Sequence, residues 1–487
     1  MTRPSCITRT IPSVRATARA VASGSRSAVE VVQEAVDRIR QDAPHLNAFL
    51  HICEDDALRE ARRVDERTRA QRRVLPLAGV PLAAKDMFVT PGPVAPTTAG
   101  SRMLEGWRAP EGYEATVLRR LREAGAVLVG KTNQDEFGMG SSGEHSAYGA
   151  TRNPLATDRV PGGSSSGSAA AVASGSVPAA LGTDTGGSVR QPAALTGTVG
   201  LRPTWGRLSR YGMVAFASSL DQAGPMTRDV EDAALLMECM AGPDPRDATT
   251  SDRSPQAWQE SAHAGVEGMR AGIARAWLED LPGSTAGAFD ELVRVLEQAG
   301  ARVEDIDLPS PGDALAAYYL IAACEASSNL ARYDGIRYGY RSSEPEDLEE
   351  LYGRSRRAGL GPEVRRRVLL GTFALSAGYV DAYYLRARKV QAGIREAFGH
   401  LFGQVDVIIG PTSPEGAWPL GAKGADPLTM YRSDTFTVPA SLAGIPALSL
   451  PCGADGEGLP IGAQVMADRF REDLVFRAAG SVERGLA

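Results

Sequence analysis

The sequence predicts an α/β fold, and three of its features predict that fold together. The chain has 487 residues, of which 43% are hydrophobic and 23% are charged, so it is long enough to bury a large core. Short apolar runs bounded by glycine recur along it, as expected of buried strands. Segments with apolar residues at helical spacing separate these runs. We therefore expect strands and helices to alternate along a soluble, globular protein.

Two helices are expected ahead of the first strand. Apolar residues recur at helical spacing across residues 27–39, and a second helical pattern covers residues 55–71. The first 20 residues are basic and lack acidic side chains, which is also the composition of a transit peptide. They contain no apolar core of the kind found in signal peptides, and we interpret them as the start of an ordinary helix.

The next part of the chain alternates strand and helix. Apolar runs at residues 77–86 and 125–133 predict two buried strands, and residues 115–125 between them predict a helix. Residues 177–182 predict a further strand directly before a glycine-rich turn. Lys85 closes the first of these runs, so we expect its side chain to project from the end of a buried strand.

The same alternation continues to the C-terminus. Residues 269–277, 287–301 and 302–309 predict a strand, a helix and a strand. The charged segment 342–357 predicts a solvated loop and helix face. Three more strands are expected within residues 405–414, 446–453 and 460–468.

Charge and cysteine content exclude several classes of protein. The net charge is −6 and the isoelectric point is near 5.6, so the chain lacks the basic balance needed to bind nucleic acid tightly by itself. The five cysteines are scattered and form no C-x-x-C pair, which indicates neither a disulfide framework nor a zinc site. The sequence contains no apolar run of about 18 residues, the length needed to span a bilayer. We expect a reducing, cytoplasmic location and no membrane contact.

Glycine surrounds one serine, Ser188, in residues 182–192. Glycines there let the backbone approach a substrate and let N–H groups converge on one point, as an oxyanion hole requires. A tight turn that ends a strand explains an isolated Gly-Gly-Ser equally well. A second cluster, residues 161–175, places Gly-Gly-Ser-Ser-Ser-Gly before small residues, which fits an open helix N-terminus or a flexible loop. It lacks the G-K-[ST] of a phosphate-binding P-loop.

A serine nucleophile needs a base, and histidine is the usual one. The chain has five histidines, but none lies in a recognisable triad motif and no G-x-S-x-G elbow occurs. Lysine is the remaining base, because burial at a strand end would lower the pKa of Lys85 and leave its amine neutral. A lysine at a strand end can instead extend its ammonium group to water. The residue by itself leaves both interpretations open.

Taken together, Lys85, Ser164 and Ser188 resemble the Ser-cisSer-Lys triad of the amidase signature family. The resemblance rests on residues 79–86, 161–175, 182–212 and 216–234. It implies the amidase signature fold, in which helices cover both faces of a central mixed, twisted β-sheet. It also implies a single amidase domain, residues 1–487. That domain would comprise an N-terminal helical layer (about 1–72), a signature core (about 73–245) and a C-terminal part (about 246–487) that completes the sheet and the substrate pocket.

Within this family the chain is most similar to the A subunits of glutamine-dependent aspartyl- and glutamyl-tRNA amidotransferases. The segments that carry this similarity are residues 130–142, 325–341, 365–390 and 426–453. The resemblance implies that Ser188 attacks the side-chain amide of glutamine and forms a glutamyl ester while ammonia leaves. Ser164 would relay the proton between Ser188 and Lys85. An oxyanion hole would be formed by the backbone N–H groups of Thr185, Gly186, Gly187 and Ser188.

The resemblance also assigns groups that would recognise glutamine. A closed pocket needs a cation for the α-carboxylate and an anion for the α-amine, because an unpaired buried charge is costly. By motif position, Arg367 would bind the carboxylate and Asp434 the amine, and Tyr318 or Tyr319 would line the pocket. Arg367 is the last of three consecutive arginines, so which of the three binds the carboxylate stays open.

If the chain is a subunit of such an amidotransferase complex, the resemblance also implies its partners and their cofactors. The resemblance implies association with B-type and C-type subunits, with ATP and Mg²⁺ bound by a partner and tRNA held only through that partner. No metal or cofactor is expected in this chain.

Three residues depart from the pattern of related A subunits. Met87 and Ser441 stand where asparagine is usual, and Ser166 stands where glycine is usual. These changes keep open a second interpretation, a stand-alone amidase or a paralogue that hydrolyses or transfers a different small amide. A third, a degenerate scaffold subunit, is disfavoured because all three triad residues are present.

Overall fold

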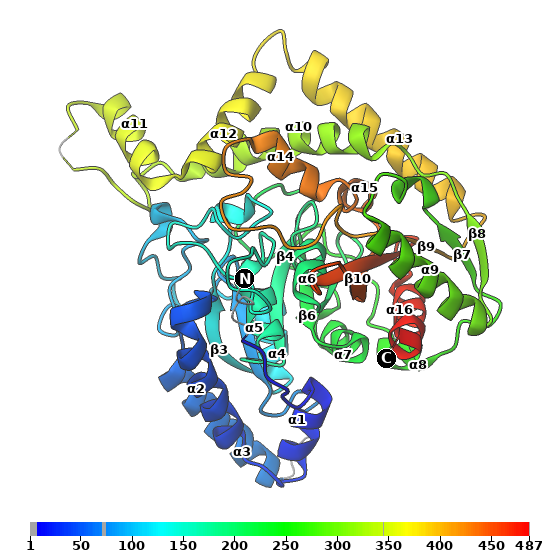
Figure 1. Ribbon diagram of the computed structural model, residues 1–487. Helices are drawn as coiled ribbons and strands as arrows, with labels where there is room; N and C mark the ends of the chain where they lie inside the picture. Colours follow the sequence, from blue (N-terminus) through cyan, green and yellow to red (C-terminus); the bar gives the residue numbers. More distant parts are fainter. Residues whose placement is uncertain (1–6, 71–74, 344, 487) are drawn as a thin grey trace.

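The computed structural model describes residues 7–70, 75–343 and 345–486, and one mixed β-sheet runs through these residues (Figure 1). Its eleven strands lie in the order β1-β3-β2-β4-β6-β5-β10-β11-β9-β7-β8. Neighbours pair in parallel from β3 to β4 and from β9 to β8, and every other neighbouring pair is antiparallel. The strands are β1 (Phe49–Ile52), β2 (Pro81–Lys85), β3 (Val127–Thr132), β4 (Ala179–Asp184), β5 (Val199–Arg202), β6 (Gln222–Thr227), β7 (Arg270–Ile273), β8 (Arg302–Asp305), β9 (Val407–Pro411), β10 (Ala447–Ala454) and β11 (Pro460–Ala467).

Helices cover one face of the sheet along its whole length. In β2, Leu82 packs into this layer while the next residue, Ala83, packs on the opposite face. The same alternation occurs in β9, where Ile409 faces this layer and Ile408 faces away. The helices of this layer are α1 (Val14–Ala22), α4 (Thr116–Glu123), α7 (Val230–Met240), α8 (Trp258–His263), α9 (Gly283–Gln298) and α16 (Glu472–Leu486).

Two further groups of helices cover the other face, so the predicted fold class is confirmed. Beside the first strands lie α2 (Ala28–Leu46), α3 (Glu54–Arg69), α5 (Ser166–Ala173) and α6 (Arg190–Thr196). Over the later strands lie α10 (Pro311–Asn329), α12 (Pro362–Ala374), α13 (Arg386–Leu401) and α15 (Val438–Ala443). The two remaining α-helices in the described part of the chain are α11 (Leu348–Gly359) and α14 (Pro427–Tyr431).

Most elements expected from the sequence are present at the expected positions. The helix predicted over residues 27–39 is α2, which begins with a reciprocal capping box between Ser27 and Glu30. The helix predicted over 55–71 is α3, and residue 71 itself lies outside the described residues. Of the basic N-terminal stretch, residues 1–6 also lie outside the description, and its later residues begin helix α1.

The remaining expected strands and helices are also confirmed, with shifts of a few residues at their ends. The segments 77–86, 125–133 and 177–182 are β2, β3 and β4, and the helix 115–125 is α4. The strand-helix-strand pattern after residue 269 is β7, α9 and β8, and the three C-terminal strands are β9, β10 and β11. The sheet draws strands from all three expected parts of the chain. The division near residues 72 and 245 stays a prediction.

A raised helical hairpin lies over the later half of the sheet. Helix α12 leads through the short π-helix η5 (Asp381–Leu385) into α13, and α10 packs beneath both helices. Figure 1 shows this hairpin in yellow and gold at the top of the molecule, with α11 projecting to one side. Charged and exposed side chains in α11 confirm the solvated face predicted for residues 342–357, of which residue 344 is not described.

Candidate active site

Lys85 ends strand β2, between its parallel neighbours β3 and β4, and its side chain is fully buried. Its Nζ atom contacts three hydroxyl groups: Ser164 Oγ at 2.7 Å, Thr183 Oγ1 at 2.8 Å and Ser165 Oγ at 3.0 Å. No carboxylate among the described residues forms an ion pair with this amine. The side chain therefore points into the protein, and the interpretation that its ammonium reaches water is wrong.

Burial lowers the pKa of Lys85 to about 7. The negative charges of Asp135, Asp184 and Asp221 act in the opposite direction and raise it. Because neutral hydroxyls surround the amine and no carboxylate in the described structure pairs with it, desolvation dominates. A large fraction of Lys85 is then uncharged near neutral pH, and an uncharged amine can accept a proton.

Ser164 lies in a buried turn that is held against the Ser188 segment. The peptide bond between Gly163 and Ser164 is cis. The amide N–H of Ser165 donates to the carbonyl oxygen of Ser188 at 3.1 Å, and the N–H of Gly163 donates to the Gln191 side chain at 2.9 Å. The tertiary structure thus brings Lys85 and both serines into one cluster.

Ser188 lies between β4 and α6, and its exposed fraction is 8%, whereas Lys85 and Ser164 are completely buried. The two preceding glycines are required by close contacts. A Cβ at Gly186 would lie 2.5 Å from the ring of Tyr318, and one at Gly187 would lie 2.2 Å from Thr437 Oγ1. Within the described residues, the amide N–H groups of Gly186, Gly187 and Ser188 donate to no protein acceptor. They are free to donate to a bound oxyanion.

Thr185 precedes these glycines, and its hydroxyl donates to Asp221 Oδ1 at 2.7 Å. The same carboxylate accepts the backbone N–H groups of Phe216 and Ala217. Burial raises the pKa of Asp221 to about 6, even though these hydrogen bonds oppose the shift. Asp221 therefore holds the first residue of the predicted oxyanion hole in place.

A buried charge cluster, which the sequence motifs did not predict, holds the start of the Ser188 segment. Asp184 accepts from Arg190 Nε at 3.0 Å and Nη2 at 3.1 Å, and from Arg202 Nη1 at 3.2 Å. All three side chains are completely buried. Burial acts to raise the pKa of Asp184, but the two guanidinium groups outweigh it and hold that pKa below its usual range. The signal for this cluster in the sequence was an acidic residue, Asp184, before Ser188 and a basic residue, Arg190, after it.

One of the three departures from the family pattern belongs to this cluster. Ser441 accepts a hydrogen bond from Arg190 Nη2 at 2.8 Å, so its hydroxyl satisfies the guanidinium where asparagine is usual. Ser166 is buried and bonds to Thr151 at 3.1 Å, and Met87 is buried beside the Ser164 turn. Both serine hydroxyls thus have polar partners, and the methionine fills an apolar position.

Of the three consecutive arginines, Arg365 and Arg366 are exposed and Arg367 alone is buried. Arg367 Nε donates to Glu363 Oε1 at 2.7 Å. Its guanidinium lies 5.0 Å and 5.2 Å from the ring centroids of Tyr319 and Tyr431. Its two terminal nitrogens donate to no acceptor within the described part of the chain. Arg367 therefore presents an oriented cation with unused donors, the arrangement that binds a carboxylate.

Asp434 is buried close to this cation. Its Oδ2 atom accepts from Ser141 Oγ at 2.7 Å and from the hydroxyl of Tyr319 at 2.9 Å, and burial raises its pKa to about 6. Tyr319 stacks on Tyr431 with ring centroids 3.9 Å apart, and the Tyr431 hydroxyl donates to Glu363 at 2.8 Å. These contacts join the predicted amine-binding and carboxylate-binding residues.

The triad region and the Arg367–Asp434 region lie next to each other. Thr437 Oγ1 bonds to the carbonyl oxygens of Gly186 at 2.6 Å and Asp434 at 3.1 Å. The ring of Tyr318 packs on Gly186 and lies 5.0 Å from that of Tyr319. Both tyrosines named from the sequence are therefore present, Tyr318 beside the nucleophile segment and Tyr319 on Asp434.

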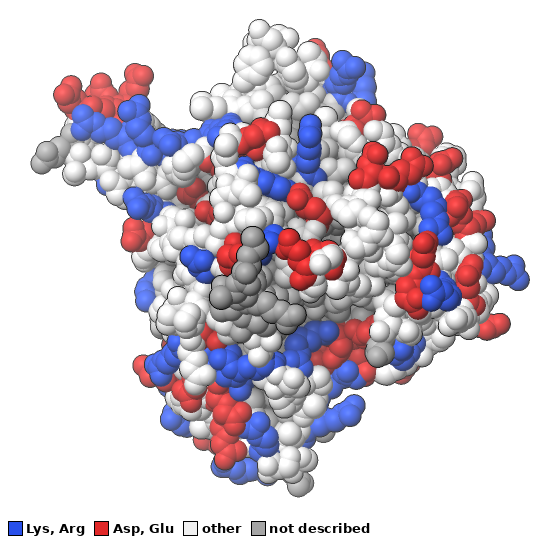
Figure 2. Space-filling view, viewed as in Figure 1, with Lys and Arg blue, Asp and Glu red and all other residues white. Residues whose placement is uncertain are grey.

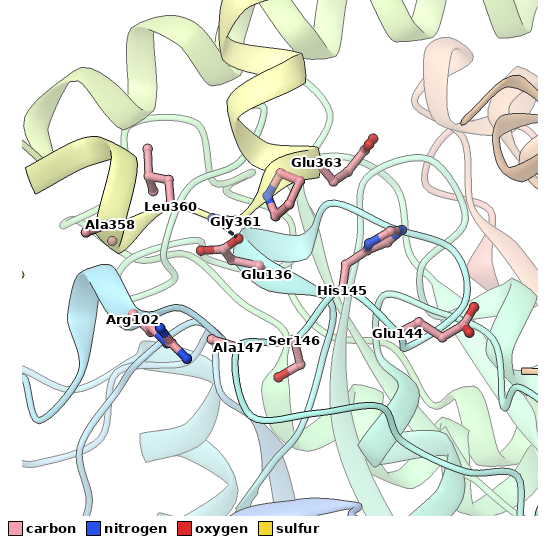
Figure 3. Close-up of a pocket in the computed structure, with 12 residues that line it drawn as sticks. Arg102, Glu136, Glu144, His145, Ser146, Ala147, Ala358, Leu360, Gly361 and Glu363 are labelled. Atoms are coloured by element: carbon pink, nitrogen blue, oxygen red, sulfur yellow. Dashed lines mark hydrogen bonds between the residues drawn. The ribbon is translucent and has the colours of Figure 1, made fainter. Parts of the chain in front are cut away.

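A cavity of about 520 Å³ adjoins the Arg367 region, and no sequence motif indicated it (Figure 3). Glu136, His145 and Glu363 contribute to its lining. Figure 3 shows Glu136 bonded to the N–H of Gly361, at 2.8 Å. Burial raises the pKa of Glu136 to about 7. Glu363 therefore lies between this cavity on one side and Arg367 on the other.

Neither a metal centre nor a membrane-spanning helix is present in the described residues. No group of three or more His, Cys, Asp or Glu side chains there is arranged to hold a metal ion. No helix within that part of the chain is long and apolar enough to cross a membrane.

This sheet, with a buried lysine and two serines at its centre, defines an amidase-type hydrolase fold and site. The chain belongs to the Amidase family, which it matches over residues 30–476. It is 51% identical to the A subunit of the glutamyl-tRNA(Gln) amidotransferase of Myxococcus xanthus, with 95% of each chain covered.

Solved structures give the same assignment. The A subunit of the glutamyl-tRNA(Gln) amidotransferase of Thermotoga maritima is 42% identical with a TM-score of 0.76, covering 94% of this chain and 91% of that one. The peptide amidase of Stenotrophomonas maltophilia is 31% identical with a TM-score of 0.83, covering 97% and 96%. The predicted resemblance to the amidase signature family is confirmed.

Proposed function

We propose that this protein releases ammonia from the side-chain amide of glutamine, as the A subunit of a tRNA-dependent amidotransferase. One observation carries the proposal: Thr437 joins the glycine turn before Ser188 to Asp434, so the nucleophile segment lies next to the residues that we propose bind an amino acid. The similarity to curated A subunits over nearly the whole chain supports the same activity.

In this proposal, the neutral amine of Lys85 accepts the proton of Ser164, which takes the proton of Ser188 as Ser188 Oγ attacks the amide carbon. The N–H groups of residues 185–188 stabilise the oxyanion of the tetrahedral intermediate, where each such donor contributes about 3 kcal/mol. The proton returns through Ser164 to the amide nitrogen, the C–N bond breaks and ammonia leaves. Water then attacks the glutamyl ester along the same proton path in reverse, releasing glutamate and restoring Ser188.

Arg367 and Asp434 select the substrate in this mechanism. The terminal nitrogens of Arg367 bind the α-carboxylate of glutamine, and Asp434 binds its α-ammonium group. Glu363 positions the guanidinium by fixing Nε, which leaves both terminal nitrogens for the ligand. Tyr318 and Tyr319 form the wall between these charges and Ser188.

The acceptor of the ammonia lies on other subunits in this proposal. B-type and C-type partners would bind ATP, Mg²⁺ and the charged tRNA, because a chain with a net charge of −6 is poorly suited to hold RNA by itself. We place the protein in the cytoplasm, where these substrates occur. Its described cysteines are free thiols, which fits a reducing compartment.

The proposed function is tested by measuring ammonia release from glutamine and from simple peptide and aryl amides, with and without the partner subunits. Glutamine-specific release that rises when the partners are added supports the proposal. Partner-independent hydrolysis of simple amides supports the second candidate, a stand-alone amidase. The fold similarity to a peptide amidase favours that candidate, and the Arg367–Asp434 pair disfavours it.

The turnover number is expected to rise as the pH increases through about 7, the pKa of Lys85. Below this pH the amine holds a proton and cannot accept one, whereas above it the amine is neutral. A pH profile of kcat at saturating glutamine measures the effect. A profile that is flat between about pH 6 and 8 would contradict the assignment of Lys85 as the base.

Replacing Asp434 by asparagine is expected to raise KM for glutamine by about 30-fold or more, with a smaller change in kcat, because the α-ammonium group loses its anion. In the wild-type protein KM should also rise as the pH falls below about 6, where Asp434 becomes protonated. Steady-state kinetics measure both effects. Asp381→Asn, at an exposed site in η5, is the matched control. An unchanged KM in Asp434→Asn would refute the role of Asp434.

A further inference from the structure

The first turn of helix α12 borders the cavity of about 520 Å³. Residues 358–363 contribute to the lining of this cavity, and Glu363 separates it from Arg367. Arg367 lies one helical turn after Glu363 on the same helix, so the position of its guanidinium depends on the position of α12. Where α12 begins therefore determines where the proposed carboxylate-binding group lies.

The two ends of α12 are held differently. Towards its C-terminal end, a Cβ at Gly371 would lie 2.0 Å from the carbonyl oxygen of Ala323, so α12 lies directly against α10 there. At its N-terminal end, the preceding helix α11 projects to one side of the molecule and exposes acidic and basic side chains (Figure 2). The contacts of residues 359–361 therefore decide where α12 begins.

Glu136 bonds to this short segment. Its side chain is 4% exposed, and its Oε2 atom accepts the N–H of Gly361 at 2.8 Å (Figure 3). The other carboxyl oxygen bonds to Ser101 Oγ, and that hydroxyl also bonds to the carbonyl oxygen of Gly359 at 3.1 Å. A Cβ at Gly361 would lie 2.3 Å from Glu136 Oε2, so the close approach requires glycine. The carboxyl group thus connects the start of α12 to the core.

Hydrogen bonding, rather than charge, explains these contacts. Burial raises the pKa of Glu136 to about 7, so the carboxyl group is partly protonated near neutral pH. The Ser101 hydroxyl has one proton and cannot donate to Glu136 and to Gly359 at once. When Glu136 is protonated, it donates to Ser101 Oγ and leaves the Ser101 proton for Gly359. The N–H of Gly361 keeps its acceptor in both forms of the carboxyl group.

The backbone around Glu136 also contacts the triad. The N–H of Asp135 donates to the carbonyl oxygen of Ser164 at 3.2 Å. A Cβ at Gly138 would lie 3.6 Å from Ser164 Oγ. Residues 135–138 therefore lie against the proposed proton relay and, through the side chain of Glu136, against the start of α12.

We propose that Glu136 is a positioning residue, which fixes the start of α12 so that Arg367 meets the α-carboxylate of glutamine while the amide lies at Ser188; the inference rests on the proposed function. The side chain acts through Gly361 and α12 rather than on the substrate. Without it, the first turn of α12 would shift toward the cavity and move Arg367, whereas the triad would stay in place. Binding of glutamine should therefore weaken more than the chemical step slows.

The test measures glutamine hydrolysis by the full chain with its partner subunits. Glu136→Ala is expected to raise KM for glutamine by about 10-fold or more and to change kcat by less than about 3-fold, because it affects binding more than chemistry. Glu136→Gln should keep KM within about 2-fold of the wild-type value, because its amide oxygen accepts the N–H of Gly361 and its NH₂ group donates to Ser101 Oγ. Glu105→Ala, at an exposed site directly after the 3₁₀-helix η1 (Arg102–Leu104), is the matched control.

Gly361→Ala tests the same contact from the other side. Apart from its chain neighbours, the three atoms nearest to the added Cβ all belong to the carboxyl group of Glu136. The φ angle of Gly361 is −70°, which any residue adopts. The methyl group should therefore displace the carboxyl group and raise KM as Glu136→Ala does. The double variant should be no worse than Glu136→Ala, because the methyl group then has no carboxyl group to displace.

Thermal unfolding of each variant shows whether it is folded, and Gly361→Ala decides the question by the same kinetics if Glu136→Ala does not fold. An unchanged KM, even with a lower unfolding temperature, or a loss confined to kcat overturns the positioning role and leaves the proposed function intact. A Glu136→Gln variant as impaired as Glu136→Ala also overturns it, because the charge would then be the property that matters. Absence of glutamine hydrolysis by the wild-type protein with its partners overturns both.

Discussion

Replacing Lys85 by alanine is expected to reduce ammonia release as far as replacing Ser188 by alanine, with each loss on the order of 10⁴-fold or more. The Lys85 amine lies 2.7 Å from Ser164 Oγ, and in the described structure no other side chain that could act as a base forms a hydrogen bond with that hydroxyl. Without the amine the proton of Ser188 has no acceptor, and without Ser188 there is no nucleophile. Glutaminase assays of the protein with its partners measure both losses.

The two substitutions should not be additive, because both residues belong to one proton-transfer unit. His145→Ala is the control, since His145 lines the neighbouring cavity without contacting Lys85 or Ser164. Mass spectrometry after trapping with a reactive amide should locate the adduct on Ser188. Near-normal turnover of the Lys85→Ala variant at neutral pH would show that another group is the base.

Replacing Asp184 by asparagine is expected to lower the free energy of unfolding by about 3–5 kcal/mol. The substitution keeps the shape of the side chain but removes the negative charge between the guanidinium groups of Arg190 and Arg202, which are completely buried. Two unpaired positive charges would then remain in a low-dielectric interior. Urea-induced unfolding followed by fluorescence measures the change.

The same variant should lose activity, because Asp184 also accepts the N–H of Val189 next to the nucleophile. Asp381→Asn, which changes an exposed carboxylate, should alter the free energy of unfolding by no more than about 0.5 kcal/mol. An Asp184→Asn variant as stable as this control would mean that the arginines are neutralised by other groups, and that the cluster does not support the Ser188 segment.

The active site joins two kinds of electrostatic environment. Around Lys85 the neighbours are neutral hydroxyls, so desolvation determines the protonation state of the amine. Around Ser188 the loop is held by full charges, Asp184 with its two arginines. The base can therefore be uncharged near neutral pH while ion pairs and a hydrogen bond to the N–H of Val189 hold the segment that carries Ser188.

Much of this protein could be predicted from its sequence, because the information is local. Glycine-bounded apolar runs predict strands such as β2, and apolar residues at helical spacing predict α2. Lys85, Ser164 and Ser188 stand in motifs whose residue types have a chemical reason, so the sequence is enough to identify them as candidates. Their roles stay predictions that the experiments above test.

Other features were decided only by the tertiary structure. Sequence order cannot distinguish Arg365, Arg366 and Arg367, but the packing of α12 on α10 buries only the last of them. Glu363 and Tyr431 meet on that guanidinium from positions 68 residues apart, so no local pattern connects them.

Thr437 and the exposed Leu369 of α12 show the same division. Thr437 contacts Gly186 although the two residues are 251 positions apart in the sequence. The exposure of Leu369 depends on which face of α12 packs into the core. The sequence by itself therefore determined the strands, the helices and the triad candidates, because propensity and motif chemistry act between near neighbours. Only the folded chain decided the charge environment, which of the three consecutive arginines is buried, and which apolar side chains are exposed, because burial and long-range contacts arise from packing.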